Sequence, residues 1–200
     1  MTRMPWPKFL RRSPAGNTAA AEFDRLLREH VPAFYRSAYR WTGAVDRAED
    51  LVQELLIRLY PMLDELRELD RVRPWAMRVM YRIFVDQLRR ERSSPVRFGL
   101  PGPDGEASDE EDDGYLDPAP EPPELVEQQL TQERIATAWA QLTDEHRVVL
   151  SMHDIEGYSL VEIGAILDTP VGTLKSRVHR ARARLREILA MERFSPSDRV

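Results

Sequence analysis

The chain has 200 residues, a formal net charge of −5 and 42% apolar residues, which is enough for one or two small cores. It has no cysteine, which excludes a disulfide framework, a thiolate metal site and a cysteine nucleophile. No apolar run approaches the roughly 18 residues of a membrane span, and the N-terminus lacks the apolar stretch of a signal peptide. We therefore expect a cytoplasmic protein with no direct membrane insertion.

The negative charge is concentrated in one segment. Residues 104–124 hold ten carboxylates and no Lys or Arg, so the rest of the chain has 24 acids against 29 bases. The segment is also rich in Pro and Gly and has too few large apolar residues to offset its ordering entropy, which predicts a flexible linker. The sequence thus divides into a disordered basic tail, a first domain, the acidic linker, a second domain and a C-terminal tail, at residues 1–18, 19–95, 96–123, 124–191 and 192–200.

Both domains are predicted to be helical, so the fold class is all-α: a three-helix domain and a four-helix domain joined by the linker. No run shows the sustained alternation of a strand. In the first domain, periodic apolar residues predict helices at about 20–41, 46–67 and 74–91, with Pro32 as a possible break in the first of them. In the second domain they predict helices at about 123–141, 144–155, 159–167 and 170–191, with N-caps at Thr143, Ser159 and Thr169.

The last of these helices is unusually basic. Leu174, Val178, Ala181, Leu185 and Ile188 form a narrow apolar stripe along it. Its cations lie outside that stripe, and the short helix before it is joined to it by the tight turn "LDTP". This is the helix-turn-helix pattern, in which the N-terminus of the second helix enters a DNA major groove. An Arg-rich, solvated surface helix is the alternative interpretation; the turn and the short partner helix favour the DNA-binding one.

The turn has Asp168 where Gly is common. Asp adopts the left-handed backbone conformation more readily than most non-glycine residues do. Asp168 in place of Gly is therefore compatible with a helix-turn-helix turn.

The segment "LTDEHRVVLSMHDIEGYSLVEIGAILDTPVGTLKSRVHRARARLREIL" closely resembles region 4 of the extracytoplasmic-function (ECF, group 4) sigma factors of bacterial RNA polymerase, in the sigma-70 family. "AEDLVQELLIRLY" with "RPWAMRVMYRIFVDQLRRERSSP" resembles their region 2. The resemblance implies a dissociable subunit that directs the polymerase to specific promoters and helps to open them. The bulky region 3 of primary sigma factors has no counterpart here.

The resemblance also implies roles for individual residues. Region 4 reads the −35 promoter element, and its base- and phosphate-contacting positions correspond to Thr173, Lys175, Ser176, Arg177, His179 and Arg180. On a helical wheel most of these residues point away from the apolar stripe, whereas Arg177 lies closer to it.

Region 2 has two roles in the family. Its polymerase-binding positions, which meet the clamp helices of the β′ subunit, correspond to Asp50, Gln53 and Glu54. The wheel places these three away from the apolar face of their helix. The positions that engage and help to open the −10 element correspond to Arg78, Tyr81, Arg82, Arg89 and Arg90. Many members have Asn where this chain has Arg82, so the family's −10 sequence preference is not carried over.

The partners implied are the polymerase core, through the β′ clamp helices and the β flap, promoter DNA and an anti-sigma factor. The resemblance implies no cofactor and no small-molecule substrate. No phosphate-cradling loop or nucleophile elbow is present, so no enzyme activity is predicted. His146 and His153 are seven residues apart, which is too far for the usual pair of metal ligands on one helix, and no metal site is predicted.

Two other functions remain open from the sequence. One is a LuxR-like helix-turn-helix regulator that binds DNA without being a polymerase subunit, because such regulators share much of region 4. The other is an interaction protein, such as an anti-sigma-type decoy, that binds a partner without promoter activity.

Overall fold

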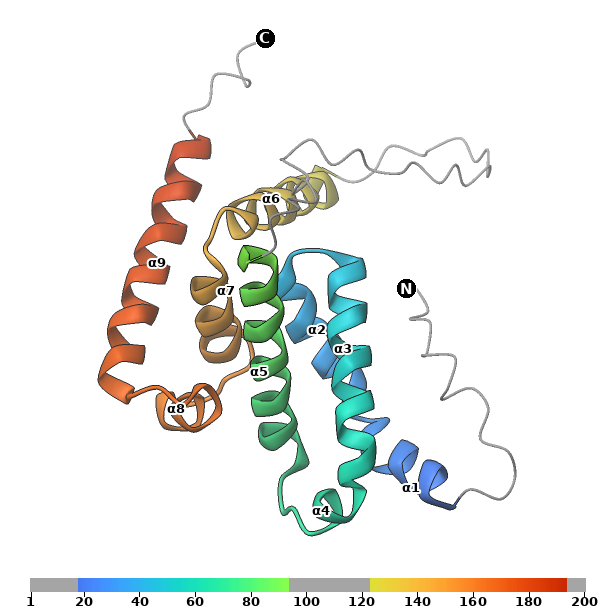
Figure 1. The fold of residues 1–200 in the computed structure, drawn as a ribbon. Coiled ribbons are helices and arrows are strands. Elements are labelled where there is room, and N and C mark those ends of the chain that lie inside the picture. Colours follow the sequence, from blue (N-terminus) through green and yellow to red (C-terminus); the bar gives the residue numbers. More distant parts are fainter. Residues whose placement is uncertain (1–17, 94–122, 194–200) are drawn as a thin grey trace, which may run out of the picture.

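The computed structural model describes residues 18–93 and 123–193, and these residues form helices and turns with no strand among them (Figure 1). This confirms the all-α prediction. The predicted tails and acidic linker lie almost wholly outside the described residues. We refer to residues 18–93 as the N-terminal unit and to residues 123–193 as the C-terminal unit.

The first predicted helix is two helices, α1 (Thr18–Leu27) and α2 (Val31–Thr42). The helix is interrupted just before Pro32, which lies in the first turn of α2. In that turn the backbone N–H groups have no partner within the helix, so the missing N–H of proline costs no hydrogen bond. The helix predicted over about 20–41 is therefore divided in two, in the region where Pro32 was expected as a possible break.

The rest of the N-terminal unit packs around α3 (Val45–Leu59). A 3₁₀ turn, η1 (Tyr60–Met62), interrupts the predicted helix 46–67 because Pro61 cannot donate to the helical ladder. The chain continues as α4 (Leu63–Arg67) and as the long helix α5 (Val72–Ser93). Large side chains from four helices fill the core, among them Phe23, Phe34, Trp41, Leu51, Leu55 and Phe84.

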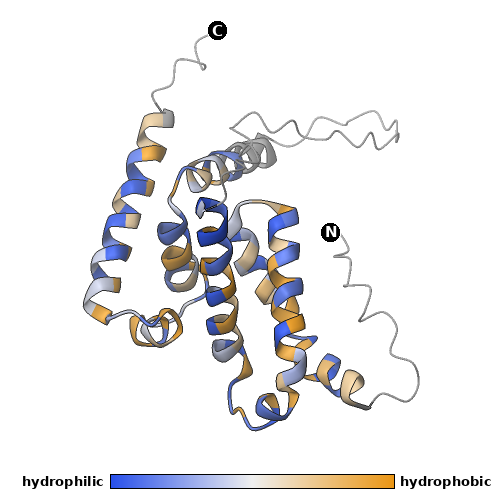
Figure 2. Cartoon of the chain, viewed as in Figure 1, coloured by the Kyte–Doolittle hydropathy of each residue, from blue (hydrophilic) through white to orange (hydrophobic). Residues whose placement is uncertain are grey.

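The C-terminal unit contains α6 (Pro123–Ala140), α7 (Asp144–Leu150), η2 (Ser151–Ile155), α8 (Leu160–Leu167) and α9 (Val171–Arg193). The sequence predicted one continuous α-helix over 144–155. In the structure the α-helix ends at Leu150, and the next five residues form the π-helical turn η2. Figure 2 shows α8 as largely hydrophobic and α9 with many hydrophilic residues. Ile163, Ile166 and Leu167 give α8 its buried face.

Local side-chain chemistry explains where these helices begin. Thr143 accepts a hydrogen bond from the His146 amide, and Ser159 forms a reciprocal capping box with Glu162, which confirms both N-caps. Thr169 does not cap α9: its hydroxyl donates to the Leu167 carbonyl, and the helix begins only after Pro170.

The turn between α8 and α9 depends on one residue in an uncommon conformation. Asp168 is left-handed (φ 52°) and ends α8, as the sequence predicted for this position. With α8 and α9 in contact across this turn, the two helices form a helix-turn-helix.

The two units pack against each other. The C-terminal half of α2 contacts α7 and η2, and α5 lies between α3 of its own unit and α8 of the other (Figure 1). The helix that the resemblance assigns to −10 DNA is therefore partly covered by the unit that it assigns to −35 DNA.

Candidate nucleic-acid and polymerase interfaces

The apolar stripe predicted on α9 is turned into the C-terminal unit. Leu174, Val178, Ala181 and Ile188 are buried, and Leu185 packs at the margin of the core. The residues predicted to contact the −35 element lie mostly on the opposite, exposed side: Thr173, Lys175, Ser176, His179 and Arg180. Small polar and cationic side chains on one open helix face suit the edges of bases and the phosphates of a major groove.

Arg177 is less exposed than the other five residues predicted to contact the −35 element. Its side chain is only 20% exposed, and its Nη2 lies 3.4 Å from Glu145 Oε2 on α7. In this arrangement the Arg177 guanidinium is paired within the protein and is turned away from the exposed face.

The predicted −10 residues lie along α5. Arg78, Arg82, Arg89 and Arg90 are exposed. Tyr81 is half-buried, with its ring edge-on to Trp41 at a centroid distance of 6.2 Å. Burial raises the pKa of Tyr81, while the nearby Arg177 opposes that shift, so the phenol stays protonated and can donate a hydrogen bond.

The predicted polymerase-binding residues lie on α3. Asp50 and Gln53 are exposed. Glu54 is already engaged: its Oε1 accepts from Arg58 Nη2 at 2.6 Å and its Oε2 from Gln87 Nε2 at 3.0 Å. The same face presents Ile57, an exposed apolar side chain that the sequence analysis did not single out. Its spacing of four residues from Gln53 is the signal that could have identified it.

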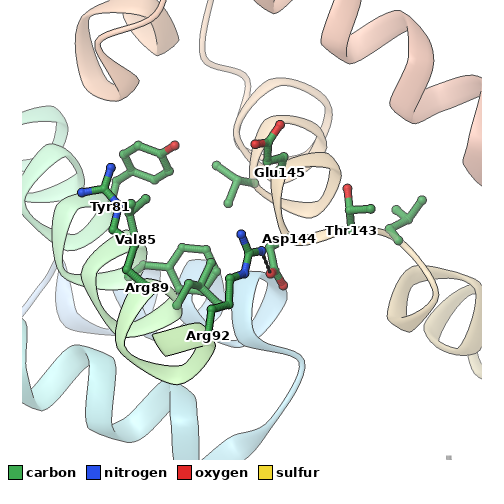
Figure 3. A pocket seen from close by; sticks show the side chains of 11 residues that line it. Tyr81, Val85, Arg89, Arg92, Thr143, Asp144 and Glu145 are labelled. Carbon is green, nitrogen blue, oxygen red and sulfur yellow. Dashed lines mark ion pairs between the residues drawn. The ribbon is translucent and has the colours of Figure 1, made fainter. Parts of the chain in front are cut away.

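A groove of about 740 Å³ lies between α5 and the start of α7, beside the region where the two units are in contact (Figure 3). Tyr81 and Arg89 of α5 lie on one side of it, and Asp144 and Glu145 of α7 lie on the other. Arg92 reaches across, with Nη2 3.7 Å from Asp144 Oδ2. The groove therefore has −10 candidates on one wall and the carboxylate that pairs with Arg177 on the other.

A second polar cluster joins the units near the loop before α5. The carboxylate of Glu156 has only 4% of its side chain exposed. Its Oε1 accepts from Arg40 Nη2 at 3.0 Å and lies 2.8 Å from Ser37 Oγ, and its Oε2 lies 3.3 Å from Arg73 Nη2. Sequence reasoning missed this cluster, because nothing in the local pattern distinguishes Glu156 from an ordinary exposed loop acid.

The described part of the chain contains no group of three or more His, Cys, Asp and Glu side chains arranged to hold a metal ion. Within the same residues, no helix is long and apolar enough to cross a membrane.

Two family models match the chain in the expected order. Residues 26–94 match the model for Sigma-70 region 2, and residues 132–185 match the model for Sigma-70, region 4. The first range covers most of the N-terminal unit. The second includes α7, α8 and most of α9.

Curated relatives match over most of the chain. The ECF RNA polymerase sigma factor SigW of Bacillus subtilis is 32% identical over 84% of this chain and 88% of its own length. SigL of Mycobacterium tuberculosis is 33% identical over 87% of this chain and 92% of its own length. SigE of Mycolicibacterium smegmatis is also 33% identical, but the chain spans only 63% of that longer relative.

Solved structures give the same fold. The sigma factor RpoE of Bartonella quintana, in a co-crystal with the anti-sigma factor NepR, superimposes with a TM-score of 0.61 at 26% identity, over 84% of this chain and 97% of that one. CnrH, solved with the cytosolic domain of CnrY, gives 0.55 at 22% identity, over 88% and 92%, and supports the fold alone. With both region models and these relatives in agreement, the chain belongs to the ECF RNA polymerase sigma factors.

Proposed function

We propose that this sigma factor binds the core polymerase through α3, reads the −35 element with α9 and engages the −10 element with α5. The observation that carries this proposal is the presence of two separate helices, α5 and α9, each with several exposed cations, on the two units that match regions 2 and 4. The division of the chain into five segments, with the linker between the two DNA-binding units, stays a prediction.

At the −35 element, the open face of α9 is suited to sequence readout. Lys175 and Arg180 are long enough to reach base edges, and Thr173 and Ser176 lie near the helix N-terminus, whose amides attract phosphate. At the −10 element, the exposed arginines of α5 provide a track for the DNA backbone.

At the polymerase, exposed Asp50, Gln53 and Ile57 give α3 a polar face with one apolar contact point, which suits docking against another helix pair. We propose the β′ clamp helices as that partner and the β flap as the partner of the C-terminal unit. The chemistry of transcription then belongs to the core polymerase, and the chain acts without a cofactor or a substrate of its own, in the cytoplasm, where the polymerase works.

We also propose regulation by an anti-sigma factor. The support is the Bartonella quintana relative, whose structure contains the anti-sigma factor NepR and which this chain matches over 97% of its length.

In vitro transcription tests the proposed function. The purified chain is added to sigma-free bacterial core polymerase with fragmented genomic DNA of the source organism, and RNA 5′ ends are sequenced. Discrete starts that share upstream −35 and −10 elements support the proposal. If no such starts appear and the chain alone binds DNA sequence-specifically, the result supports the LuxR-like alternative. If the chain binds the core polymerase but gives no starts, the result supports the decoy. The match of residues 26–94 to region 2 already weighs against the LuxR-like alternative.

A further inference from the structure

Helix α9 is tied to the rest of its unit at one edge by a bidentate ion pair. Arg182 Nε donates to Asp154 Oδ2 at 3.0 Å, and Arg182 Nη2 donates to Asp154 Oδ1. These hydrogen bonds from Arg182 hold the pKa of Asp154 below its usual range, although burial opposes the shift. The carboxylate therefore stays ionised at neutral pH and remains a partner for the guanidinium.

Asp154 belongs to η2, the π-helical turn that follows α7. In that turn the Glu156 amide donates to the Ser151 carbonyl oxygen, five residues back, at 2.9 Å. Such turns are wider than the turns of an α-helix and occur frequently at functional sites. The 3.6-residue period of an α-helix therefore does not give the direction of the Asp154 side chain, which the structure turns towards α9.

A weaker ion pair lies at the opposite edge of α9. At about 100° per residue, Arg182 lies about 80° to one side of Leu174 in the apolar stripe, and Arg177 lies about 60° to the other side. Arg177 Nη2 lies 3.4 Å from Glu145 Oε2, and the Glu145 side chain is 68% exposed. A pair with so exposed an acid contributes little, whereas bidentate geometry makes a pair stronger and more directional. The Asp154–Arg182 pair is therefore the stronger restraint on rotation of α9 about its own axis.

The rotation of α9 decides which of its side chains can reach the DNA bases. A roll of about 10° moves a side-chain tip that lies about 6 Å from the helix axis by about 1 Å. A bidentate contact between arginine and a base needs donor–acceptor distances of about 2.7–3.2 Å, so a shift of that size breaks it. Hydrophobic contacts along the apolar stripe are non-directional. A directional tie at one edge of the helix therefore matters for readout.

We propose that Asp154 is a positioning residue for the −35 element: through Arg182 it fixes the rotation of α9 that presents Lys175 and Arg180 to the bases. This inference rests on the proposed function and adds a residue outside α9 to the −35 site. An acid beside a DNA-binding helix repels phosphates, so Asp154 does not favour DNA by its own charge. Its contribution comes from the orientation of the helix, and Arg182 acts within the protein.

Selection from randomised −35 elements tests the proposal. The full chain is assembled with core polymerase, and the holoenzyme selects among promoter fragments that carry a start found by the transcription assay and random bases at the −35 positions. Discrimination is the ratio of binding to the preferred −35 sequence over the mean of the library. The substitution is Asp154→Asn. The matched control is Glu187→Gln, which also removes one negative charge but breaks a pair within α9, with Arg184.

Asp154→Asn should lower discrimination by about fivefold or more, the loss expected when one bidentate contact with a base is misplaced. Glu187→Gln should leave discrimination unchanged. Because both variants gain the same charge, a general rise in DNA affinity should appear in both. Because discrimination is a ratio, a smaller folded fraction lowers all binding alike and does not change it. Equal discrimination in Asp154→Asn and the unsubstituted chain overturns the proposal.

Exchange of the two charges separates positioning from direct DNA contact. Asp154→Arg combined with Arg182→Asp restores the ion pair in reverse, and it should recover most of the discrimination that Asp154→Asn loses. If the exchanged pair recovers none, Arg182 is needed at the DNA and its role within the protein is overturned.

Failure of the proposed function gives a different result. If the unsubstituted holoenzyme selects no −35 sequence, the reading of that element by α9 is rejected, and the positioning role is rejected with it. If the unsubstituted holoenzyme selects a sequence and Asp154→Asn selects it equally well, only the positioning role is rejected.

Discussion

Arg147 of α7 donates from Nε to the carbonyl oxygen of Trp41, at 3.0 Å, and so caps the C-terminal turn of a helix in the other unit. The same guanidinium donates to Asp144 Oδ1 at 2.6 Å, and the residue is 9% exposed. A cation at a helix C-terminus satisfies otherwise unpaired carbonyls and interacts favourably with the helix dipole. This contact couples the stability of α2 to the presence of the C-terminal unit.

Arg147→Met should lower the free energy of unfolding by about 1.5–3 kcal/mol, because it removes a charged hydrogen bond from a buried carbonyl. Urea titration followed by tryptophan fluorescence measures the change, since Trp41 and Trp139 both lie at this contact. Arg28→Met, at an exposed position on the N-terminal unit, is the control and should change the free energy by less than about 0.5 kcal/mol. Equal effects of the two substitutions would contradict the capping role.

The sequence predicted several features that depend on near neighbours, although the N-cap expected at Thr169 was wrong. The helix-turn-helix, the caps at Thr143 and Ser159 and the left-handed Asp168 were all predicted, because each depends on side chains within a few positions. The outward direction of Lys175 and Arg180 followed from helical periodicity in the same way.

The contacts between the units could not be predicted. Ser37 and Glu156, for instance, meet across 119 positions of sequence, and neither lies in a pattern that indicates a buried partner. Glu54 was predicted to be available to a partner, although Arg58, four residues along the same helix, and Gln87, 33 positions away, both donate to it. Only the contact with Gln87 depends on residues far apart in the sequence. A helical wheel gives the direction of a side chain but not what another helix brings to it.

Arg180→Ala should lower promoter-dependent transcription by about 5- to 150-fold, as expected for the loss of a bidentate contact between arginine and a base. Its affinity for the core polymerase should not change, because Arg180 lies on the exposed face of α9 that we propose for DNA and not on α3, the proposed docking helix. In vitro transcription and core-binding titrations measure the two effects separately. Arg186→Ala removes the same exposed charge further along α9 and is the control. An equal loss in both variants would indicate a general charge effect in place of base readout.

Gln53→Ala should weaken binding to the core polymerase by at least about fivefold, because a polar side chain at the centre of an interface leaves its partner group unpaired when it is removed. The thermal stability of the free chain should not change, since Gln53 is exposed. Fluorescence anisotropy with labelled chain measures the affinity. Glu65→Ala, an exposed change on α4, is the control, and a similar loss there would argue against α3 as the docking face.

Gly164→Ala and Gly172→Ala should change stability in opposite directions. A Cβ at Gly164 would lie 3.0 Å from the Thr169 backbone oxygen in the tight turn, which should destabilise the protein by about 1–3 kcal/mol. A Cβ at Gly172 meets nothing within 4 Å, so the loss of backbone freedom in the unfolded chain should stabilise it by up to about 1 kcal/mol. Chemical denaturation measures the free energy of unfolding of both variants. If both are less stable than the unsubstituted chain, the close approach of a Cβ to the Thr169 oxygen does not explain the loss in Gly164→Ala.

The pH dependence of stability should report His146. Burial lowers the pKa of His146; Glu145 beside it opposes this shift, and Arg177, Arg180 and Arg184 of α9 add to it. With the folded pKa below the unfolded value of about 6.5, the unfolded chain binds more protons as pH falls through that value, so stability decreases towards lower pH. His146 Nδ1 is buried without a hydrogen-bond partner among the described residues, so a proton there would have no acceptor. Chemical denaturation between pH 7.5 and pH 5 should show this decrease in the free energy of unfolding. His146→Gln should make the free energy depend less steeply on pH. If the pH dependence of His146→Gln is unchanged, other groups cause it.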